Sequence, residues 1–238
     1  IGPAVGLPVM EGKALIFKLL GGVDAVPLVL DAGDPDAFVA TVKALAPSFG
    51  GINLEDIAQP KCFGLLEQLQ DELEIPVWHD DQQGTATVVL AAVLNALKLV
   101  GKSLDTVEIA MVGMGAANVA NYRLLTAAGA DAGAVIACDV RGTLHQRRHD
   151  LEAQADVAPQ WRICQETNAD DVVGGTADAV RGANVLIAFS RPGPDVIAPD
   201  WVRTMAEDAI VIAGAIPTPE ILPADAHAAG ARIVGTGR

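Results

Sequence analysis

Short apolar runs and longer mixed stretches follow one another along the chain, and they predict strands and helices in turn. In the first stretch the helices are bounded by proline near the start, or by glycine or proline after the end. We expect helices at Pro8–Leu20, Asp36–Leu45 and Pro60–Leu73, and short strands at Val26–Leu30 and Pro76–Trp78. This part of the pattern predicts a small α/β domain.

The pattern changes after residue 78. A strongly apolar helix is expected over Thr85–Leu99, and beyond Gly101 predicted strands alternate with helices. Alternation of this kind is typical of a parallel sheet that helices cover on both faces. The strands are expected at Val107–Val112, Val135–Asp139, Val185–Phe189, Ile210–Ala213 and Arg232–Val234, and the helices at Ala116–Ala128, Ala177–Arg181 and Pro219–Ala229.

We therefore predict an α/β fold with two domains, 1–78 and 79–238, the second built on a parallel sheet. A chain of 238 residues is long enough for two domains. Clefts between domains are favoured ligand sites. Residues near the expected boundary at His79 are therefore candidates for a site.

A Gly-x-Gly turn follows the strand predicted over Val107–Val112. Gly113 permits a tight turn, and Gly115 lets the backbone approach a pyrophosphate at the N-terminus of the next helix. Asn118 stands where a third glycine usually allows a helix to pack closely on the strand. The succession of strand, turn and helix predicts a dinucleotide site, with a purely structural turn as the alternative.

Three further residues are candidates for the same site. Asp139 ends the next predicted strand, where an acid can accept hydrogen bonds from both ribose hydroxyls and repel a 2′-phosphate, which favours NAD over NADP. Arg141 could instead pair with such a phosphate. Ser190 follows another predicted strand, at the end where open parallel sheets place their ligand loops.

Two acidic pairs, Glu55-Asp56 and Asp80-Asp81, are flanked by apolar residues. Carboxylates in such surroundings are costly to bury unless a cation or hydrogen-bond donors offset their charge. Each pair alone could cap a helix, the first through Asn53 with Asp56 in the first turn, the second through either aspartate. Taken together, the pairs predict a shared site for a hard divalent metal, which needs carboxylate oxygens from separate segments.

Lys13 has apolar neighbours three and four positions away in its predicted helix, namely Val9, Met10, Ile16 and Phe17. Desolvation of an amine on such a face favours its neutral form and makes it a candidate general base. The alternative is a lysine whose stem packs in the core while its head reaches water. The spacing leaves both interpretations open.

The histidines carry weaker signals. His79, beside the second acidic pair, could be a metal ligand or a histidine held by a hydrogen bond where the helix begins. His145 and His149 flank Arg147 and Arg148, and we expect these four residues on a solvated face.

Composition narrows the choice of partners. Acidic residues outnumber basic ones by 30 to 16, for a formal net charge of −14, which argues against nucleic acid and anionic membranes. The longest apolar run, Ala86–Val100, is too short to span a bilayer, and we expect no secretory signal. The 3 cysteines lack metal-ligand spacing and indicate reduced thiols in a cytoplasmic protein.

Several segments of the sequence closely resemble the bacterial and archaeal malic enzymes. They are Pro8-Val-Met-Glu-Gly-Lys-Ala-Leu-Ile-Phe-Lys18, Phe49-Gly-Gly-Ile-Asn-Leu-Glu-Asp56, His79-Asp-Asp-Gln-Gln-Gly-Thr-Ala86, Leu94-Asn-Ala-Leu-Lys-Leu-Val100 and Pro217-Thr-Pro-Glu-Ile221. The resemblance covers essentially the whole chain. It implies a metal- and substrate-binding α/β domain over residues 1–78, itself incomplete, and a Rossmann-type NAD-binding domain over residues 79–238.

The resemblance also implies roles for individual residues. Glu55, Asp56 and Asp81 match the family's ligands for Mg²⁺ or Mn²⁺. Lys13 matches the catalytic lysine, and Asp80 the acid that orients it. The implied reaction is metal-dependent oxidative decarboxylation of malate to pyruvate and CO₂, with NAD, or alternatively NADP, as the oxidant. We also expect a homo-oligomer, a dimer or larger.

Departures from the family pattern keep two other functions open. The family usually has histidine where Gln83 stands, asparagine where Ile216 stands and a small residue where Asn118 stands. Its catalytic tyrosine would lie before the first residue and its Asn-rich substrate segment after the last, and Tyr122 does not match that tyrosine. The alternatives are a dehydrogenase for another metal-chelated 2-hydroxy acid, and a non-catalytic NAD-binding relative with a regulatory role.

Overall fold

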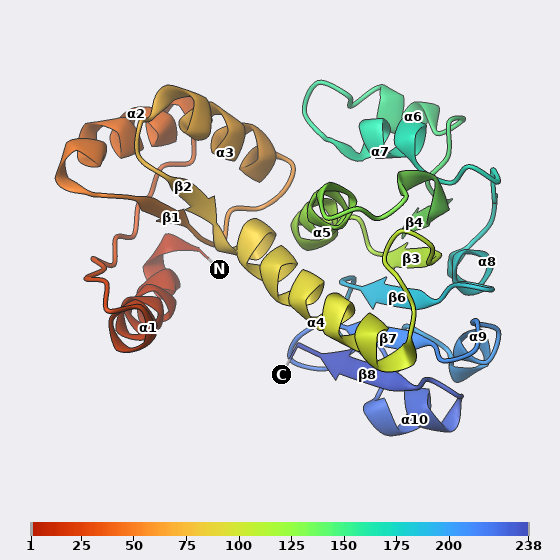
Figure 1. Ribbon diagram of the computed structural model, residues 1–238. Helices are drawn as coiled ribbons and strands as arrows, with labels where there is room; N and C mark the ends of the chain where they lie inside the picture. Colours follow the sequence, from red (N-terminus) through yellow and green to blue (C-terminus); the bar gives the residue numbers. More distant parts are fainter. Residues whose placement is uncertain (1, 238) are drawn as a thin grey trace. The chain divides into compact units, whose positions relative to one another are not determined.

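The computed structural model describes residues 2–237, and the chain divides into two compact units (Figure 1). The first unit comprises the chain up to Ile57 together with Leu65–Trp78. The second comprises Ala58–Gly64 together with the chain from His79 onward. The backbone therefore passes from one unit to the other after Ile57, after Gly64 and after Trp78.

The first unit combines helices with a two-stranded sheet of β1 and β2. Its core consists of apolar side chains from α2, α3 and the two strands: Val39, Val42, Leu54, Leu65, Leu66, Leu69 and Val77. The elements are α1 (Pro3–Gly21), α2 (Pro35–Leu45), the 3₁₀ turn η1 (Ala46–Ser48), β1 (Ile52–Leu54), α3 (Lys61–Glu72) and β2 (Val77–His79).

Local chemistry explains where the first two helices begin and end. Pro3 stands in the first turn of α1, and Gly22 ends the helix with a left-handed φ of 66°. Asp34 caps α2 by accepting a hydrogen bond from the Ala37 backbone N–H at 2.9 Å. The long α1 contributes no buried side chain among those that the structure describes.

The strand expected at Val26–Leu30 is wrong, because the structure has no strand there. Pro27 lacks the N–H that a strand ladder needs, and the side chains of Val26 and Leu28 are exposed. A short apolar run without a neighbouring strand and without a face to bury does not form a sheet.

The second unit contains a six-stranded sheet in the order β5-β4-β3-β6-β7-β8. The predicted parallel sheet is confirmed, since each of the pairs β4–β3, β3–β6, β6–β7 and β7–β8 is parallel. The short β5, which pairs antiparallel with β4, was not expected. The strands are β3 (Ile109–Val112), β4 (Val135–Asp139), β5 (Gly142–Thr143), β6 (Val185–Ala188), β7 (Ile210–Ala213) and β8 (Ile233–Thr236).

Helices cover both faces of this sheet, as Figure 1 shows, with α4 and α5 on one side and α8, α9 and α10 on the other. The helices are the π-helical turn η2 (Asp80–Gly84), α4 (Thr85–Val100), α5 (Ala116–Ala127), the 3₁₀ turn η3 (Ala132–Ala134), α6 (His149–Glu152), α7 (Gln160–Glu166), α8 (Thr176–Val180), α9 (Pro199–Val202) and α10 (Pro223–Ala228). Because both faces are covered, the central strands β3, β6 and β7 are buried at every position.

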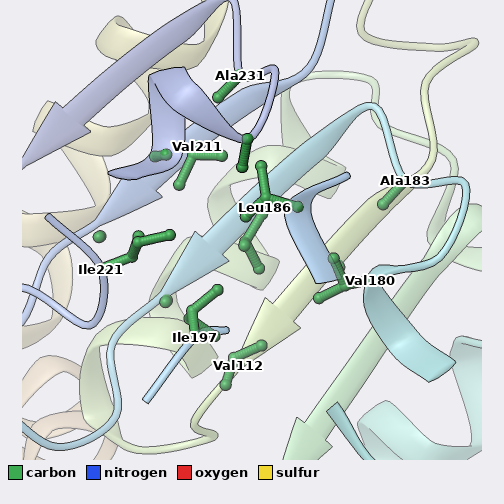
Figure 2. Close-up of a cluster of buried hydrophobic side chains, with 14 residues drawn as sticks. Val112, Val180, Ala183, Leu186, Ile197, Val211, Ile221 and Ala231 are labelled. Atoms are coloured by element: carbon green, nitrogen blue, oxygen red, sulfur yellow. The ribbon is translucent and has the colours of Figure 1, made fainter. Parts of the chain in front are cut away.

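The core between the sheet and α8–α10 is shown in Figure 2, where Val112, Leu186 and Val211 of neighbouring strands meet Val180 of α8. Ile197 and Ile221, from the loops beyond β6 and β7, complete the cluster. These loops are thus anchored by buried apolar side chains close to the edge of the sheet where the strands end.

The continuous helical stretch Asp80–Val100 is longer than the apolar run read from the sequence. By length and composition alone it could cross a membrane, a test that the core helix of a soluble protein also passes. In this structure α4 packs against α5 and β7 within the second unit. Its inward face is made of Ala86, Val89, Val93, Ala96 and Leu97.

Candidate functional site

The loops after β3, β4, β6 and β7 share one edge of the second unit's sheet, because these strands are parallel. The chain runs from β3 to β4 on one side, and β6 lies on the other side of β3. Open parallel sheets bind ligands at the carboxyl ends of their strands, where the strand order reverses in this way. The crevice position is therefore between the ends of β3 and β6.

The two glycines of the turn after β3 differ in whether the fold requires them. Gly113 has φ 85°, and a Cβ there would lie 2.4 Å from the carbonyl oxygen of Phe189, so only glycine allows the β6 loop to pass this close. A Cβ on Gly115 would lie 3.8 Å from its nearest neighbour, Nε2 of Gln59. The fold does not require the second glycine, which leaves room for a phosphate above the N-terminus of α5.

Asn118, the departure from the glycine pattern, is fully buried in the first turn of α5. Its Nδ2 donates to the carbonyl oxygens of Val112 at 3.0 Å and Gly113 at 2.7 Å. Its Oδ1 accepts from Nδ2 of Asn121 at 2.9 Å. The amide therefore fixes the turn to the end of β3, which is a shape-determining role that a small residue could not provide.

A side-chain amide from α7 also supports the turn. Nε2 of Gln160, in α7, donates to the carbonyl oxygen of Met114 at 2.8 Å and to Oε1 of Gln59 at 3.4 Å. Sequence reasoning missed both glutamines, since they lie far from the turn along the chain and belong to no motif. Gln59 lies in Ala58–Gly64, a short segment of the second unit that residues of the first unit precede and follow along the chain.

Asp139, at the end of β4, is held by three hydrogen bonds. Its Oδ1 accepts from Nη1 of Arg148 at 3.1 Å and from the backbone N–H of Arg141 at 2.8 Å. Its Oδ2 accepts from Nη2 of Arg148 at 2.6 Å. The solvated face expected around His145–His149 is therefore wrong for Arg148, which is only 8% exposed because its fork is turned inward onto Asp139.

The guanidinium of Arg148 also binds a second carboxylate. Its Nε donates to Oδ1 of Asp150 at 2.8 Å and its Nη2 to Oδ2 at 2.9 Å. These hydrogen bonds lower the pKa of Asp150 to about 2, and both carboxylates raise the pKa of Arg148. Arg141 points its exposed side chain to the same Asp150, with Nη1 3.1 Å from Oδ2. Charges thus alternate from Asp139 through Arg148 and Asp150 to Arg141.

Ser190, after β6, is held by a buried acid that sequence reasoning missed. Oε1 of the fully buried Glu220 accepts hydrogen bonds from the backbone N–H of Ser190 at 2.8 Å and from its Oγ at 3.2 Å. Oε2 accepts from the backbone N–H of Ala215 at 3.0 Å. One carboxylate therefore joins the loops after β6 and β7. The sequence did offer one signal for this buried acid, since Glu220 stands between the apolar residues Pro219 and Ile221.

In the first unit the structure brings Lys13 and Glu55 together. Nζ of Lys13, in α1, lies 3.0 Å from Oε2 of Glu55, just after β1, and both side chains are largely shielded from water. The amine is thus shielded beside Glu55, although its apolar helical neighbours Ile16 and Phe17 are exposed. Asp56, the next residue, has φ 55°, a left-handed conformation that aspartate tolerates better than most residues. The backbone bend exposes Asp56 beside the shielded Glu55.

The second acidic pair lies in the π-helical turn η2 that precedes α4. The N-cap of α4 is Gly84, without a side-chain cap hydrogen bond, so the capping interpretation of Asp80 and Asp81 is wrong. A Cβ on Gly84 would lie 2.4 Å from Oδ1 of Asp80, so this glycine lets the carboxylate fold over the turn. The corresponding cap at Asn53 is also wrong, because Asn53 lies in β1.

His79 is fully buried immediately before this turn. Its Nδ1 lies 3.8 Å from Oδ2 of Asp81, and its backbone N–H donates to Oε1 of Gln83 at 2.7 Å. Gln83 therefore accepts a main-chain hydrogen bond across the turn, which ties its side chain to the residue that precedes the turn.

The donor set of the two acidic pairs has one chemical character. Glu55 and Asp56 of the first unit, and Asp80 and Asp81 of the second, offer carboxylate oxygens only. Such hard ligands suit Mg²⁺ or Mn²⁺ and do not suit soft metals, which prefer thiolates. The residues present therefore fit a hard divalent cation.

Comparisons with known proteins point to a single family. A family model described as the malic enzyme N-terminal domain matches residues 1–70. The bifunctional malic/malolactic enzyme of Bacillus subtilis is 45% identical over 238 residues, which is 100% of this chain and 56% of that enzyme. The NAD-dependent malic enzyme of Geobacillus stearothermophilus is 46% identical over 239 residues, covering 100% of this chain and 48% of that enzyme.

Solved structures give the same result. A malic enzyme from Pyrococcus horikoshii superposes with a TM-score of 0.95 and 52% identity, covering 100% of this chain and 55% of that one. The malic enzyme of Entamoeba histolytica also has a TM-score of 0.95, at 47% identity over 99% of this chain and 50% of its own. The chain spans about half the length of the relatives that it matches.

Proposed function

Because this chain belongs with the malic enzymes in sequence and fold, we propose that the protein oxidatively decarboxylates malate to pyruvate and CO₂ with reduction of NAD. The observation that carries the proposal is the 46% identity to an NAD-dependent malic enzyme across the whole chain.

Lys13 is the proposed general base. Its Nζ takes the proton from the 2-hydroxyl of malate as the adjacent carbon is oxidised. Nζ lies 3.0 Å from Oε2 of Glu55, and this contact holds the amine in place in the first unit. Glu55 is also a proposed metal ligand, so a bound cation would engage this carboxylate, and Lys13 would accept the proton as the neutral amine. Asp80 is the acid proposed to orient that amine, on the basis of its position in the family motif.

Glu55, Asp56 and Asp81 are the proposed ligands for Mg²⁺ or Mn²⁺. When bound, such a cation supplies a Lewis acid that stabilises the negative charge developing on the substrate oxygen. The all-carboxylate donor set supports this assignment.

Gly113, Gly115, Asn118, Asp139, Arg141 and Ser190 are the proposed coenzyme-binding residues. The open space at Gly115 and the N-terminus of α5 suit the pyrophosphate. Asp139 ends the strand beside the glycine turn, where it can accept a hydrogen bond from the adenosine ribose. We therefore propose that NAD is preferred, with NADP as the weaker alternative.

A direct assay tests the reaction. The full-length protein, incubated with L-malate, NAD and Mn²⁺, is expected to form NADH, pyruvate and CO₂ in equal amounts, with no turnover in the presence of EDTA. Formation of oxaloacetate without CO₂, or NADH formation that does not depend on metal, would contradict the proposal.

One observation favours a second candidate, a dehydrogenase for a different metal-chelated 2-hydroxy acid. Ile216, in the loop after β7, is 63% exposed and stands where the family usually has an asparagine. An apolar side chain cannot replace the hydrogen bonds of an amide. A panel of 2-hydroxy acids, compared by kcat/KM, separates the two candidates, since a higher value for another acid than for malate would favour the second.

We also propose a homo-oligomer, a dimer or larger, in the cytoplasm. The exposed apolar side chains of α1, such as Leu19 and Leu20, support association. The free, buried cysteines suit a reducing compartment. The net charge of −14 supports a small-molecule substrate in place of nucleic acid or an anionic membrane.

A further inference from the structure

A buried arginine beside the proposed ribose site calls for an explanation. Burying a guanidinium costs several kcal/mol unless its charge and its donors are matched. Arg148 meets this requirement with Asp139 on one side and Asp150 on the other, and its Nη1 also donates to the carbonyl oxygen of Thr143 at 3.3 Å. The fork is therefore fully engaged and cannot turn away from Asp139 without breaking several hydrogen bonds.

The bonds to Arg148 limit what Asp139 can still accept. A carboxylate has about four lone-pair sites, two on each oxygen. Oδ1 already accepts from Arg148 and from the backbone of Arg141, and Oδ2 accepts once from Arg148. One site remains, on Oδ2, in a side chain that is 20% exposed. Asp139 can therefore receive one ribose hydroxyl, in one direction, whereas the sequence suggested that it could receive two.

The same bonds change the electrostatic argument for coenzyme choice. Asp139 is matched by Arg148, and Asp150 by Arg148 and Arg141, so two negative and two positive groups share this corner. Repulsion of a 2′-phosphate by a lone aspartate is therefore weakened. Discrimination must depend on the direction of the one hydrogen bond that Asp139 can still accept.

We infer that Arg148 is a positioning residue for coenzyme selection: its fork aims Oδ2 of Asp139 at the adenosine ribose, and this aim makes NADH bind better than NADPH. The inference rests on the proposed function, because it presupposes a coenzyme at the edge of the sheet beyond β3. Arg148 touches Asp139 and not the reacting atoms, so it affects coenzyme affinity and not the chemical step.

Three variants of the full-length protein test this inference. R148K keeps the positive charge but cannot form the fork. D139N keeps the shape of the side chain but loses its charge. R147K is the matched control, because Arg147 is the exposed neighbour that pairs with Asp171. Dissociation constants for NADH and NADPH are measured by fluorescence titration, and kcat and KM for NAD are measured with saturating malate.

R148K is expected to weaken NADH binding about tenfold, the loss of one hydrogen bond to a charged acceptor, while NADPH binding changes less than about twofold. KM for NAD should rise in parallel with little change in kcat. D139N should have a similar effect alone but add little in the R148K background, because both substitutions remove the same hydrogen bond. R147K should behave as wild type.

Several results would overturn the inference. One is wild-type affinity and wild-type preference in R148K. Another is full additivity of R148K with D139N. If R148K does not fold, the D139N variant tests the inference by itself. An unchanged ratio of NADH to NADPH affinity in D139N would show that Asp139 does not bind the ribose. Wild-type protein that binds neither coenzyme would overturn the proposed function, and this inference with it, whereas normal coenzyme binding with an unaffected R148K overturns only the inference.

Discussion

The two units of the chain bury their apolar side chains to different depths. In the second unit, strands β3, β6 and β7 are buried at every position. In the first, the longest helix exposes 68% of Leu19 and 84% of Leu20. Apolar content therefore does not by itself locate a core. The second unit carries a complete core, and we expect it to have the higher free energy of unfolding.

The carboxylates of the proposed site show a similar contrast. In the second unit Asp139 and Glu220 each accept several hydrogen bonds from fixed donors. In the first, Glu55 forms an ion pair with Lys13 and Asp56 is exposed. The coenzyme side is thus preorganised by the fold. The metal side combines an ion-paired, shielded glutamate with an exposed aspartate, and both offer the hard oxygen ligands that suit a divalent cation.

Asp81→Asn should produce the largest effect, and it tests whether metal-dependent turnover can be lost without loss of coenzyme binding. Loss of one proposed ligand should reduce metal-dependent turnover by more than about 100-fold, the upper limit for residues that only support a ligand. Affinity for NADH should stay close to wild type, because coenzyme binding is a property of the glycine turn. Steady-state rates at increasing Mn²⁺ and NADH titrations measure the two effects.

Asp200→Asn is the matched control, since Asp200 is an exposed acid that pairs with Arg203. It should leave both quantities unchanged. Full activity of Asp81→Asn without added metal would remove this residue from the ligand set.

Lys13→Ala tests the first unit's contribution to the chemistry. Loss of a general base should reduce kcat by about 10²–10⁴-fold, with little change in the affinity for NADH. Lys18→Ala is the control, since Lys18 lies in the same helix and pairs with Asp24 at an exposed position. Near-normal kcat for Lys13→Ala would assign the proton to another group.

Substitutions in the two cores sharpen the comparison of stability. Leu186→Ala should cost about 4–5 kcal/mol, and Leu69→Ala about 2–3 kcal/mol, because the cluster around Leu186 is larger and more completely enclosed. Urea unfolding measures both. Trp78 reports on the first unit and Trp161 and Trp201 on the second, so single-tryptophan variants can follow each separately.

Leu99→Ala, at an exposed position on α4, is the control and should cost less than about 0.5 kcal/mol. Equal losses for Leu186→Ala and Leu69→Ala would contradict the ranking of the two cores.

Glu220→Gln tests the preorganisation of the loops after β6 and β7. An amide N–H₂ group would face at least one of the N–H donors of Ser190 and Ala215, which leaves a buried donor without an acceptor. The expected cost is about 1–3 kcal/mol in the free energy of unfolding. Faster amide exchange at Ser190 and Ala215 would accompany it, whereas the exposed Glu207→Gln should change neither. Unchanged exchange would mean that the loops are held by their apolar anchors alone.

Thiol labelling gives the smallest signal and reports on the second unit only. Cys62, Cys138 and Cys164 all belong to it, and all are free and buried. Burial raises the pKa of Cys62 and of Cys164 from 9.0 to about 11. Because the thiolate is the reactive form, alkylation at pH 8 should be about 100-fold slower than for an unperturbed thiol, and it should accelerate as the pH approaches 11. Rapid labelling at pH 8 would indicate local opening of the second unit.

The elements predicted best from sequence are those that depend on local signals. The turn from β3 into α5 was predicted because strand, glycines and helix are adjacent along the chain. Strand β4 was predicted with its observed bounds, since Val135–Asp139 is a continuous apolar run that ends in an acid. Helical spacing left open whether the Lys13 amine is shielded; the structure places it against Glu55, while its apolar helical neighbours Ile16 and Phe17 are exposed.

What the sequence missed depends on partners that are distant along the chain. Arg148 lies in a charged stretch, and only the return of that stretch beside Asp139 buries it. Glu220 acquires its role from Ser190 and Ala215, which belong to two different loops. The strand expected at Val26–Leu30 failed for the same reason, because strand formation needs a neighbouring strand that no local pattern reveals.

The segment Ala58–Gly64 has a consequence for the modularity of this protein. It belongs to the second unit although residues of the first unit precede and follow it. Within the second unit Gln59 accepts from Gln160, and the Cys62 carbonyl oxygen accepts from Nε2 of Gln82 at 3.4 Å. A cut after Trp78 would therefore remove seven residues that the second unit needs for its own packing. The two units therefore cannot be exchanged between proteins as two contiguous segments. A chimaera would have to keep residues 58–64 with the second unit and residues 65–78 with the first.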